Sequence, residues 1–297
     1  MSDCVNITWK NGLGNQLFQY AYGRILAEQL KCPLTYSSVE DAGFEPFSNL
    51  HPFPRMRGDG LSLIDYELIS DPKDIVKYSG ENVKVNIDYN KTQAVELENP
   101  HNYKLYLDRI KSWFPRVQEK NTDDLVVHLR LGDNGPNIYT PFEWYKKAIE
   151  DNEITFDKLY LVTDSSDSED AKIFKSYYNA KITSSVEVSS NADWKNYKSE
   201  TMFDFDFIRG FDKILFSNST FSWWAALLSD ASQVWFNKEW QPNHYNGMIR
   251  LGETDYPNWK GIIPFSLVGS ENNVYNKKWR ETVHEGAPGY DSFNWEE

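Results

Sequence analysis

Two short runs of this 297-residue chain, at residues 126–133 and 215–228, have the residue types and spacing of an anion-binding site. The first is VVHLRLGD, in which His128 and Arg130 alternate with leucines and Gly132-Asp133 follows. Alternation in a strand places His128 and Arg130 on one face, and the glycine ends the strand at its carboxyl end. A guanidinium held there can bind a phosphate through two parallel hydrogen bonds. The alternative is an ion pair between Arg130 and Asp133 that serves only the fold.

The second run is LFSNSTFSWWAALL, where a predicted strand leads into a predicted helix. Four small polar residues, Ser217 to Thr220, stand just before the apolar helical part. The first turn of a helix offers N–H groups without intrahelical partners and a partial positive charge, and the hydroxyl groups add further donors. This combination suits one anionic group. A plain Ser or Thr N-cap is the alternative interpretation.

A third group is Asp204-Phe205-Asp206, a pair of carboxylates that could hold a divalent cation against a diphosphate. The alternation of Phe203, Phe205 and Phe207 permits another interpretation. The segment would then be half-buried with its acidic side chains in solvent, or Asp204 would cap a helix. We favour this structural interpretation over a metal site.

The amino-terminal segment CVNITWKNGLGNQLFQYAYGRILAEQL predicts a strand, a turn at Gly12 and Gly14, and then a helix. A dinucleotide could bind at such a turn. The G-x-G-x-x-G pattern fails, however, because Leu17 stands where the third glycine would permit close packing of helix and strand. A tight turn that needs positive φ is the alternative. The amides of Asn15 and Gln16 begin the helix, and we expect them to face a ligand.

The elements that must position these runs alternate between strand and helix. The patterns predict strands at 32–41, 125–131, 158–164, 184–189, 213–218 and 233–236 and helices at 103–114, 141–151, 168–178, 201–212 and 220–230. Pro115 ends the helix at 103–114. Alternation through the second half predicts a doubly wound parallel sheet, and hence a Rossmann-like α/β domain that binds its ligand at the carboxyl ends of the strands.

Composition excludes several classes of protein. A formal net charge of −13 argues against nucleic-acid binding and requires that local donors hold any anionic ligand. Cys4 and Cys32 cannot form a disulfide framework, and the five histidines form no cluster with zinc-ligand spacing. We expect a cytoplasmic protein without a signal peptide or an integral membrane span, and peripheral contact with a membrane stays open.

Taken together, these segments resemble the α-1,2-fucosyltransferases of glycosyltransferase family 11. Those enzymes begin with an element like G-x-G-N-Q-L-F-Q-Y-A, matched by Gly12 to Ala21, and carry H-x-R-x-G-D, matched by His128 to Asp133. Their N-S-S/T-F-S-W-W element matches Asn218 to Trp224. A strand ending in Ser/Thr-Asp matches Thr163-Asp164, and an aspartate fourteen residues before the Asn-Ser pair matches Asp204.

The resemblance implies a GT-B-like α/β fold of two Rossmann-like domains. Residues 1–120 would form the acceptor-side domain, 121–270 the GDP-sugar-binding domain and 271–297 a polar tail. It implies inverting transfer of L-fucose from GDP-β-L-fucose to O2 of a galactoside or another hexose in an oligosaccharide, with no cofactor and no required metal. Catalytic roles are implied for Arg130, Asp133, Asn15 and His128, and donor contacts for Gly14, Arg130, Asp164, Asp204, Asn218, Ser219, Thr220, Phe221 and Ser222.

Within this set the resemblance implies that Arg130 binds the diphosphate of the donor substrate. It also implies that Ser219, Thr220 and the N–H groups after them bind the same negative charge. Asn15 resembles the asparagine that protein O-fucosyltransferases place beside the reacting centre. The family is not expected to need the aspartate pair as metal ligands, because the first aspartate of the pair then contacts the donor.

The general base that would accept the proton of the acceptor hydroxyl is not identified. Asp133 and His128 are the candidates, and burial of His128 as a supporting residue is equally consistent with the strand geometry. Three rival functions stay open. They are a glycan-binding protein with this fold, a metal-dependent transferase of another nucleotide sugar that uses Asp204 and Asp206, and a dehydrogenase, which Leu17 disfavours.

Overall fold

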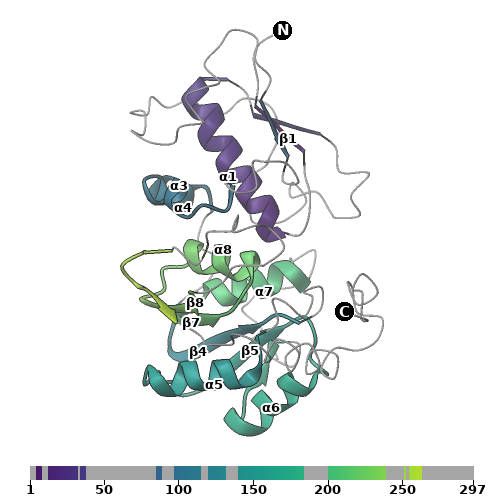
Figure 1. The fold of residues 1–297 in the computed structure, drawn as a ribbon, viewed down its shortest axis with the longest axis vertical. Coiled ribbons are helices and arrows are strands. Elements are labelled where there is room, and N and C mark those ends of the chain that lie inside the picture. The colour runs from purple at the N-terminus through teal and green to yellow at the C-terminus, as the bar shows by residue number, and fades with distance from the viewer. Residues whose placement is uncertain are drawn as a thin grey trace, which may run out of the picture. The chain divides into compact units, whose positions relative to one another are not determined.

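The computed structural model describes residues 5–8, 13–32, 34–37, 85–88, 97–114, 120–131, 140–183, 200–238, 251 and 254–262 (Figure 1). The chain forms two compact units. Unit 1 comprises Met1–Arg116, Lys195–Met202 and Met248–Arg250, and unit 2 comprises Val117–Trp194, Phe203–Gly247 and Leu251–Glu297. Both units contain parallel strands and helices, so each has an α/β architecture.

Unit 1 contains a three-stranded parallel sheet with the order β2-β1-β3. Its elements are β1 (Val5–Thr8), α1 (Leu13–Leu30), β2 (Leu34–Ser37) and β3 (Val85–Asp88). Helix α1 approaches the sheet closely at Gly23, because a Cβ there would lie 3.1 Å from side-chain atoms of both Ile7 and Ile87. Gly23 therefore permits close packing of the helix against the strands. In a dinucleotide fingerprint the third glycine has this role, nearer the start of the helix.

The helix predicted at 103–114 is two helices, so this prediction is wrong. Helices α3 (His101–Lys104) and α4 (Leu107–Trp113) are separated at Tyr106, whose φ of −110° and ψ of 11° do not continue a helix. Leu105, expected among the apolar positions of one helix, is 69% exposed. The Tyr106 hydroxyl accepts a hydrogen bond from Gln29 of α1 over 2.7 Å. This tertiary contact lies outside what a local apolar pattern encodes.

Unit 2 contains a six-stranded sheet with the order β6-β5-β4-β7-β8-β9, in which every pairing is parallel. The strands are β4 (Asn121–Leu129), β5 (Leu159–Thr163), β6 (Lys181–Ile182), β7 (Phe211–Phe216), β8 (Gln233–Asn237) and β9 (Trp259–Ile262). Counted within the unit, this is the strand order of doubly wound dinucleotide-binding folds. The prediction of an α/β fold with a doubly wound parallel sheet is confirmed.

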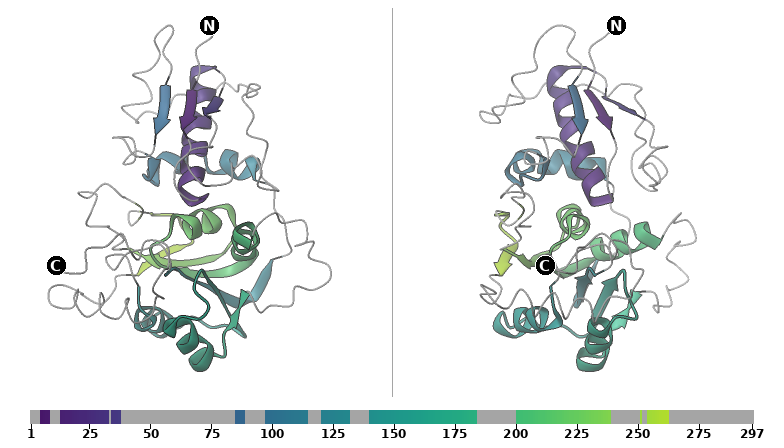
Figure 2. Two further views of the ribbon diagram at one scale, coloured as in Figure 1. Left: turned by 90° about the vertical axis from the view of Figure 1, so that its right-hand side faces the viewer. Right: turned by 45° about the vertical axis from the view of Figure 1, so that its right-hand side comes forward.

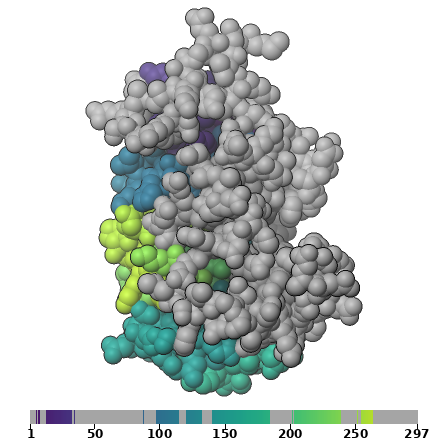
Figure 3. Space-filling view, in the orientation of Figure 1, coloured from purple at the N-terminus to yellow at the C-terminus, as the bar shows by residue number. Residues whose placement is uncertain are grey.

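Helices cover both faces of this sheet. Helices α5 (Phe142–Asp151) and α6 (Glu169–Tyr178) lie on one face, and α7 (Glu200–Arg209) and α8 (Thr220–Leu228) lie on the other (Figure 1, Figure 2). In the space-filling view, α5 and α6 belong to the teal part of the surface (Figure 3). Because both faces are covered, β4 is buried from Asp124 to Leu129, which explains the continuous apolar run in its sequence.

Helix α8 is buried along its length from Phe221 to Leu228. Trp223 is fully buried, and its ring centroid lies 5.9 Å from that of Trp259 on β9. Its Nε1 donates to Thr254 Oγ1 over 2.9 Å. These contacts hold residues 254–262 against α8. A helix that is apolar on all sides is suited to this enclosed position.

Other strands and segments were either not predicted or lie where the prediction is not tested. Strands β3 and β9 are not among the predicted strands, since four-residue strands carry too little periodicity to be recognised. The strand predicted at 184–189 and the tail from residue 271 lie outside the described residues. The assignment of residues 1–120 and 121–270 to acceptor and donor stays a prediction.

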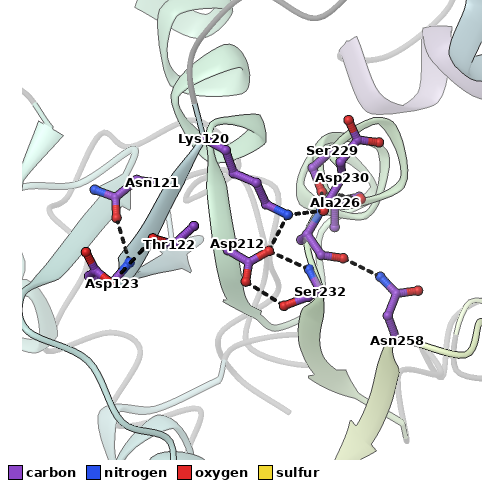
Figure 4. A network of polar contacts seen from close by, with 11 residues as sticks. Lys120, Asn121, Thr122, Asp123, Asp212, Ala226, Ser229, Asp230, Ser232 and Asn258 are labelled. Atoms are coloured by element: carbon purple, nitrogen blue, oxygen red, sulfur yellow. Dashed lines mark hydrogen bonds and ion pairs between the residues drawn. The ribbon is translucent and has the colours of Figure 1, made fainter.

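A polar network joins the amino ends of the neighbouring strands β4, β7, β8 and β9 of unit 2 (Figure 4). Asp212 accepts from Lys120 and from the backbone N–H of Ser232, the latter over 2.8 Å, and Asn258 donates to the Ala231 carbonyl over 2.6 Å. Burial raises the pKa of Asp212, but hydrogen bonds from Lys120 and Ser232 outweigh it and leave the pKa below its usual value. This network links the amino ends of the strands. The predicted anion-binding runs lie at the opposite, carboxyl ends.

Candidate active site

The order in which successive strands are added across the sheet reverses between β4 and β7. From β4 the strands run outward through β5 to β6, and from β7 they run outward the other way through β8 to β9. In open α/β sheets, ligands bind outside the carboxyl ends of the strands at such a switch point. Arg130 follows β4 directly, and Ser217–Ser222 follows β7. The residues His128, Arg130, Asp164 and Asn218–Ser222 are together termed the switch-point site.

His128 joins the two predicted runs. Its Nδ1 is hydrogen-bonded to Ser222 Oγ, and its ring centroid lies 5.5 Å from that of Phe221. His128 is buried and Ser222 is fully buried. On β4, His128 pairs with Phe216 of β7, which places it beside the start of α8. A strand end and a helix start that are 94 residues apart in the sequence therefore form one site.

The buried imidazole of His128 is neutral. Burial, together with the positive charge of Arg130, lowers the pKa of His128 to about 3. One ring nitrogen therefore donates while the other accepts. A group with this pKa is a poor proton acceptor near neutral pH, so His128 suits a positioning role toward Ser222 and Phe221 better than the role of general base.

We expect His128 to make the protein less stable in acid. Its pKa is about 6.5 in the unfolded chain, above the folded-state value, so the unfolded state binds more protons in the interval between them. The free energy of unfolding then falls by up to about 1.4 kcal/mol for each unit that the pH drops through this interval. Urea unfolding between about pH 4 and about pH 7 should show a smaller slope for His128→Gln than for the wild type. An unchanged slope in His128→Gln would contradict a buried neutral imidazole at this position.

The first turn of α8 is arranged to receive negative charge. Ser219 is the N-cap, and its Oγ accepts from the Ser222 N–H over 3.4 Å. The N-cap interpretation is therefore correct for Ser219, and it does not compete with anion binding, because capping uses an oxygen lone pair and leaves the hydroxyl proton for a ligand. Thr220 is half-buried at the first position of the helix. The hydroxyls, the N–H groups and the helix dipole form one set of donors.

Two further contacts hold neighbouring strand ends. Asp164 directly follows β5, is exposed, and accepts from the Leu131 N–H over 2.9 Å through its Oδ1. The half-buried Asn218 accepts through its Oδ1 from Asn237 Nδ2 at the end of β8, over 3.0 Å. Asp164 therefore fixes the chain that leaves β4, whether or not it also contacts a ligand. The site draws on four adjacent strands.

The aspartate pair on α7 cannot act as one chelating pair. Asp204 and Asp206 lie two residues apart in a helix, where such side chains do not face each other. Asp206 is buried and forms an ion pair with Arg209 over 2.8 Å, and Asp204 is half-buried. The expectation that both acids face solvent is wrong for Asp206. Capping by Asp204 is also wrong, because α7 begins at Glu200.

The remaining predicted site residues lie elsewhere. Gly14 and Asn15 belong to unit 1, where α1 already begins at the buried Leu13. Gly14 is thus a buried residue of the first helical turn and not part of the turn before it. Asn15 is half-buried and Gln16 is buried. Asp133 lies outside the described residues.

Sequence reasoning misses two residues at this edge of the sheet, Tyr145 and Asn237. Tyr145 occupies an ordinary apolar position of the helix at 141–151, and no sequence signal indicates that its hydroxyl is used. Asn237 follows the predicted strand 233–236, and a polar residue at the carboxyl end of a strand is a signal that could have identified it.

Two absences hold for the described part of the chain. No three His, Cys, Asp or Glu side chains there are grouped so as to hold a metal ion. None of the helices described is both long enough and apolar enough to cross a membrane.

Comparisons with known proteins find similarity among solved structures. No family model matches the sequence, and no curated protein matches it. Among solved structures, the chain is similar to the NodZ α-1,6-fucosyltransferase in a crystal soaked with GDP-fucose. The two share 13% sequence identity with a TM-score of 0.41, over 82% of this chain and 98% of that one. The functional proposal therefore rests on the residues of the switch-point site.

Proposed function

We propose that this protein is a glycosyltransferase of GT-B-like fold that transfers fucose from GDP-fucose to a hydroxyl group of a glycan. The observation that carries the proposal is the contact between His128 and Ser222, because it unites the H-x-R-x-G-D and N-S-T-F-S-W-W runs at the switch point of the sheet. An arginine and a helix N-terminus at this place suit the diphosphate of a nucleotide sugar.

Arg130 is assigned to the donor diphosphate. It is half-buried directly after β4, so its side chain starts at the carboxyl end of the strand. Ser219, Thr220 and the N–H groups of the first turn of α8 share the negative charge. Such local donors are needed because the net charge of −13 repels an anion at long range.

The reaction breaks the bond between fucose C1 and the β-phosphate oxygen of GDP and forms a bond between C1 and the acceptor oxygen. The sugar passes through a state of oxocarbenium character while negative charge grows on the departing GDP. Hydrogen-bond donors of the protein lower the barrier if they bind this phosphate more tightly as its charge increases. Attack on the face opposite to GDP converts the β-linked donor into an α-fucoside.

The acceptor assignment follows from the sequence resemblance. We assign O2 of a galactoside or another hexose as the acceptor, with unit 1 as the acceptor side and Asn15 beside the reacting centre. Of the two candidate general bases, the low pKa of His128 favours Asp133 as the group that takes the acceptor proton.

The test is calorimetric titration of GDP and UDP into the wild type in the presence of EDTA, followed by assay of GDP-fucose consumption with a panel of galactosides. GDP should bind selectively without a divalent cation. Thr220→Val should weaken GDP binding by about tenfold, since it removes a hydrogen bond to a charged phosphate. The matched control is Thr122→Val at the opposite end of β4, where the exposed hydroxyl cannot reach the same edge.

The outcomes separate the rival functions. Absence of GDP binding, or GDP binding that appears only with a divalent cation, would overturn the proposal. GDP binding without consumption of GDP-fucose on any acceptor would favour the glycan-binding protein. An NMR spectrum of the product that shows a linkage other than α-1,2 would retain the fucosyltransferase and exclude the linkage.

A further inference from the structure

Tyr145 bridges the two strand ends that form the switch-point site. It lies on α5 with its side chain fully buried. Its hydroxyl oxygen lies 3.1 Å from the His128 carbonyl oxygen and 2.6 Å from Ser217 Oγ. Edge-on ring contacts with Trp144 and Phe174 hold the phenol in place, with centroids 5.0 Å and 5.4 Å away. A fixed ring from a helix thus presents one hydroxyl to β4 and to the end of β7.

This bridge stands where the backbone pairing of β4 with β7 ends. The last pair of the register joins His128 to Phe216. Beyond this pair one chain continues to Arg130, and the other continues through Ser217 into α8. The Tyr145 hydroxyl therefore links the two chains at the point where they part.

The protons of the bridge can be assigned. The His128 carbonyl only accepts, so both contacts are satisfied when the Tyr145 hydroxyl donates to it and the Ser217 hydroxyl donates to Tyr145. Burial raises the pKa of Tyr145, so the phenol keeps its proton. The Ser217 hydroxyl donates its one proton to Tyr145, so it is not a hydrogen-bond donor to phosphate. Ser219 differs in this respect.

We propose that Tyr145 is a positioning residue for the donor nucleotide, because by joining His128 to Ser217 it sets the separation between Arg130 and the first turn of α8. This inference rests on the proposed function. A diphosphate held by both groups at once needs them at a fixed separation, and a displacement of about 1 Å in such a site can cost on the order of 10²-fold in rate.

The test is calorimetric titration of GDP into Tyr145→Phe, which keeps the ring and removes the hydroxyl. GDP binding should weaken by about tenfold, a change of about 1.4 kcal/mol. The matched control is Tyr178→Phe, because Tyr178 packs against the same core and its buried hydroxyl has no hydrogen-bond partner in the described structure. The control should bind GDP as the wild type does.

A second variant separates positioning from simple stabilisation. Ser217→Ala removes the β7 half of the bridge and leaves the bond from Tyr145 to His128, so it should also weaken GDP binding. The double variant should bind GDP no more weakly than Tyr145→Phe alone, because both changes break the same link. A tyrosine with a structural role only would lower Tm and leave the Kd for GDP unchanged well below Tm.

The outcomes distinguish this inference from the proposed function. Wild-type GDP affinity in both folded variants, Tyr145→Phe and Ser217→Ala, would overturn the inference and leave the proposed function standing. A wild type that does not bind GDP would overturn both. If Tyr145→Phe does not fold, the GDP affinity of Ser217→Ala decides between the same two results.

Discussion

Arg130→Ala should lower kcat for fucosyl transfer by about 10²- to 10³-fold, the loss typical when one preorganised donor to a developing negative charge is removed. In the proposed mechanism the guanidinium at the end of β4 would bind the β-phosphate more tightly as GDP departs, so its contribution would be larger in the transition state than in the bound substrate. The measurement is the initial rate of GDP release from GDP-fucose at saturating donor and acceptor. GDP affinity should fall as well, because the ground state also carries a diphosphate charge.

Two variants test whether the effect comes from this contact. Arg130→Lys keeps the charge but loses the planar fork, so it should recover only part of the activity. Lys238→Ala removes an equal charge from an exposed residue that follows β8 at the same edge of the sheet, and should change kcat by less than about twofold, since exposed charges are screened. An equal loss of kcat in Lys238→Ala would indicate that the overall electrostatic field of the protein, and not this contact, causes the effect. Full activity in Arg130→Ala would exclude the diphosphate assignment.

Asp206→Ala should lower the free energy of unfolding by about 3 to 5 kcal/mol, because it removes the carboxylate that pairs with a buried guanidinium. The Asp206 side chain is fully buried and that of Arg209 is 6% exposed, so water cannot replace the lost partner. The measurement is urea denaturation in EDTA. The exposed Asp167→Ala serves as the control and should leave the stability nearly unchanged.

A double variant tests whether the pair is structural. Replacing both charges, with Asp206→Leu and Arg209→Met, should restore much of the lost stability, since no charge is then left buried alone. A metal site would behave differently. Wild-type stability of Asp206→Ala in EDTA, combined with a loss of Mn²⁺ binding by this variant, would reinstate the metal-dependent transferase.

The α/β class and the two runs that form the switch-point site can be predicted from local sequence patterns. Apolar periodicity and small polar breaks are local properties, so the strand at 125–131 and the helix at 220–230 are recognisable without any tertiary contact. Arg130 and Ser219 were identified for the same reason, because each stands at the end of a periodic segment. The pattern failed at Leu105, where one expected helix is two, since the backbone of Tyr106 leaves the helical conformation.

Which of these residues meet depends on the tertiary fold. The strand order that places β4 beside β7 arises from pairing between strands far apart in the chain, and no local period encodes it. The bond between His128 and Ser222, the bridge through Tyr145 and the lowered pKa of His128 all follow from that pairing and from burial. The aspartates of α7 show the same limit. Alternating Phe203, Phe205 and Phe207 resemble a strand, but helix formation separates Asp204 from Asp206, and burial beside Arg209 makes Asp206 an ion-pair partner.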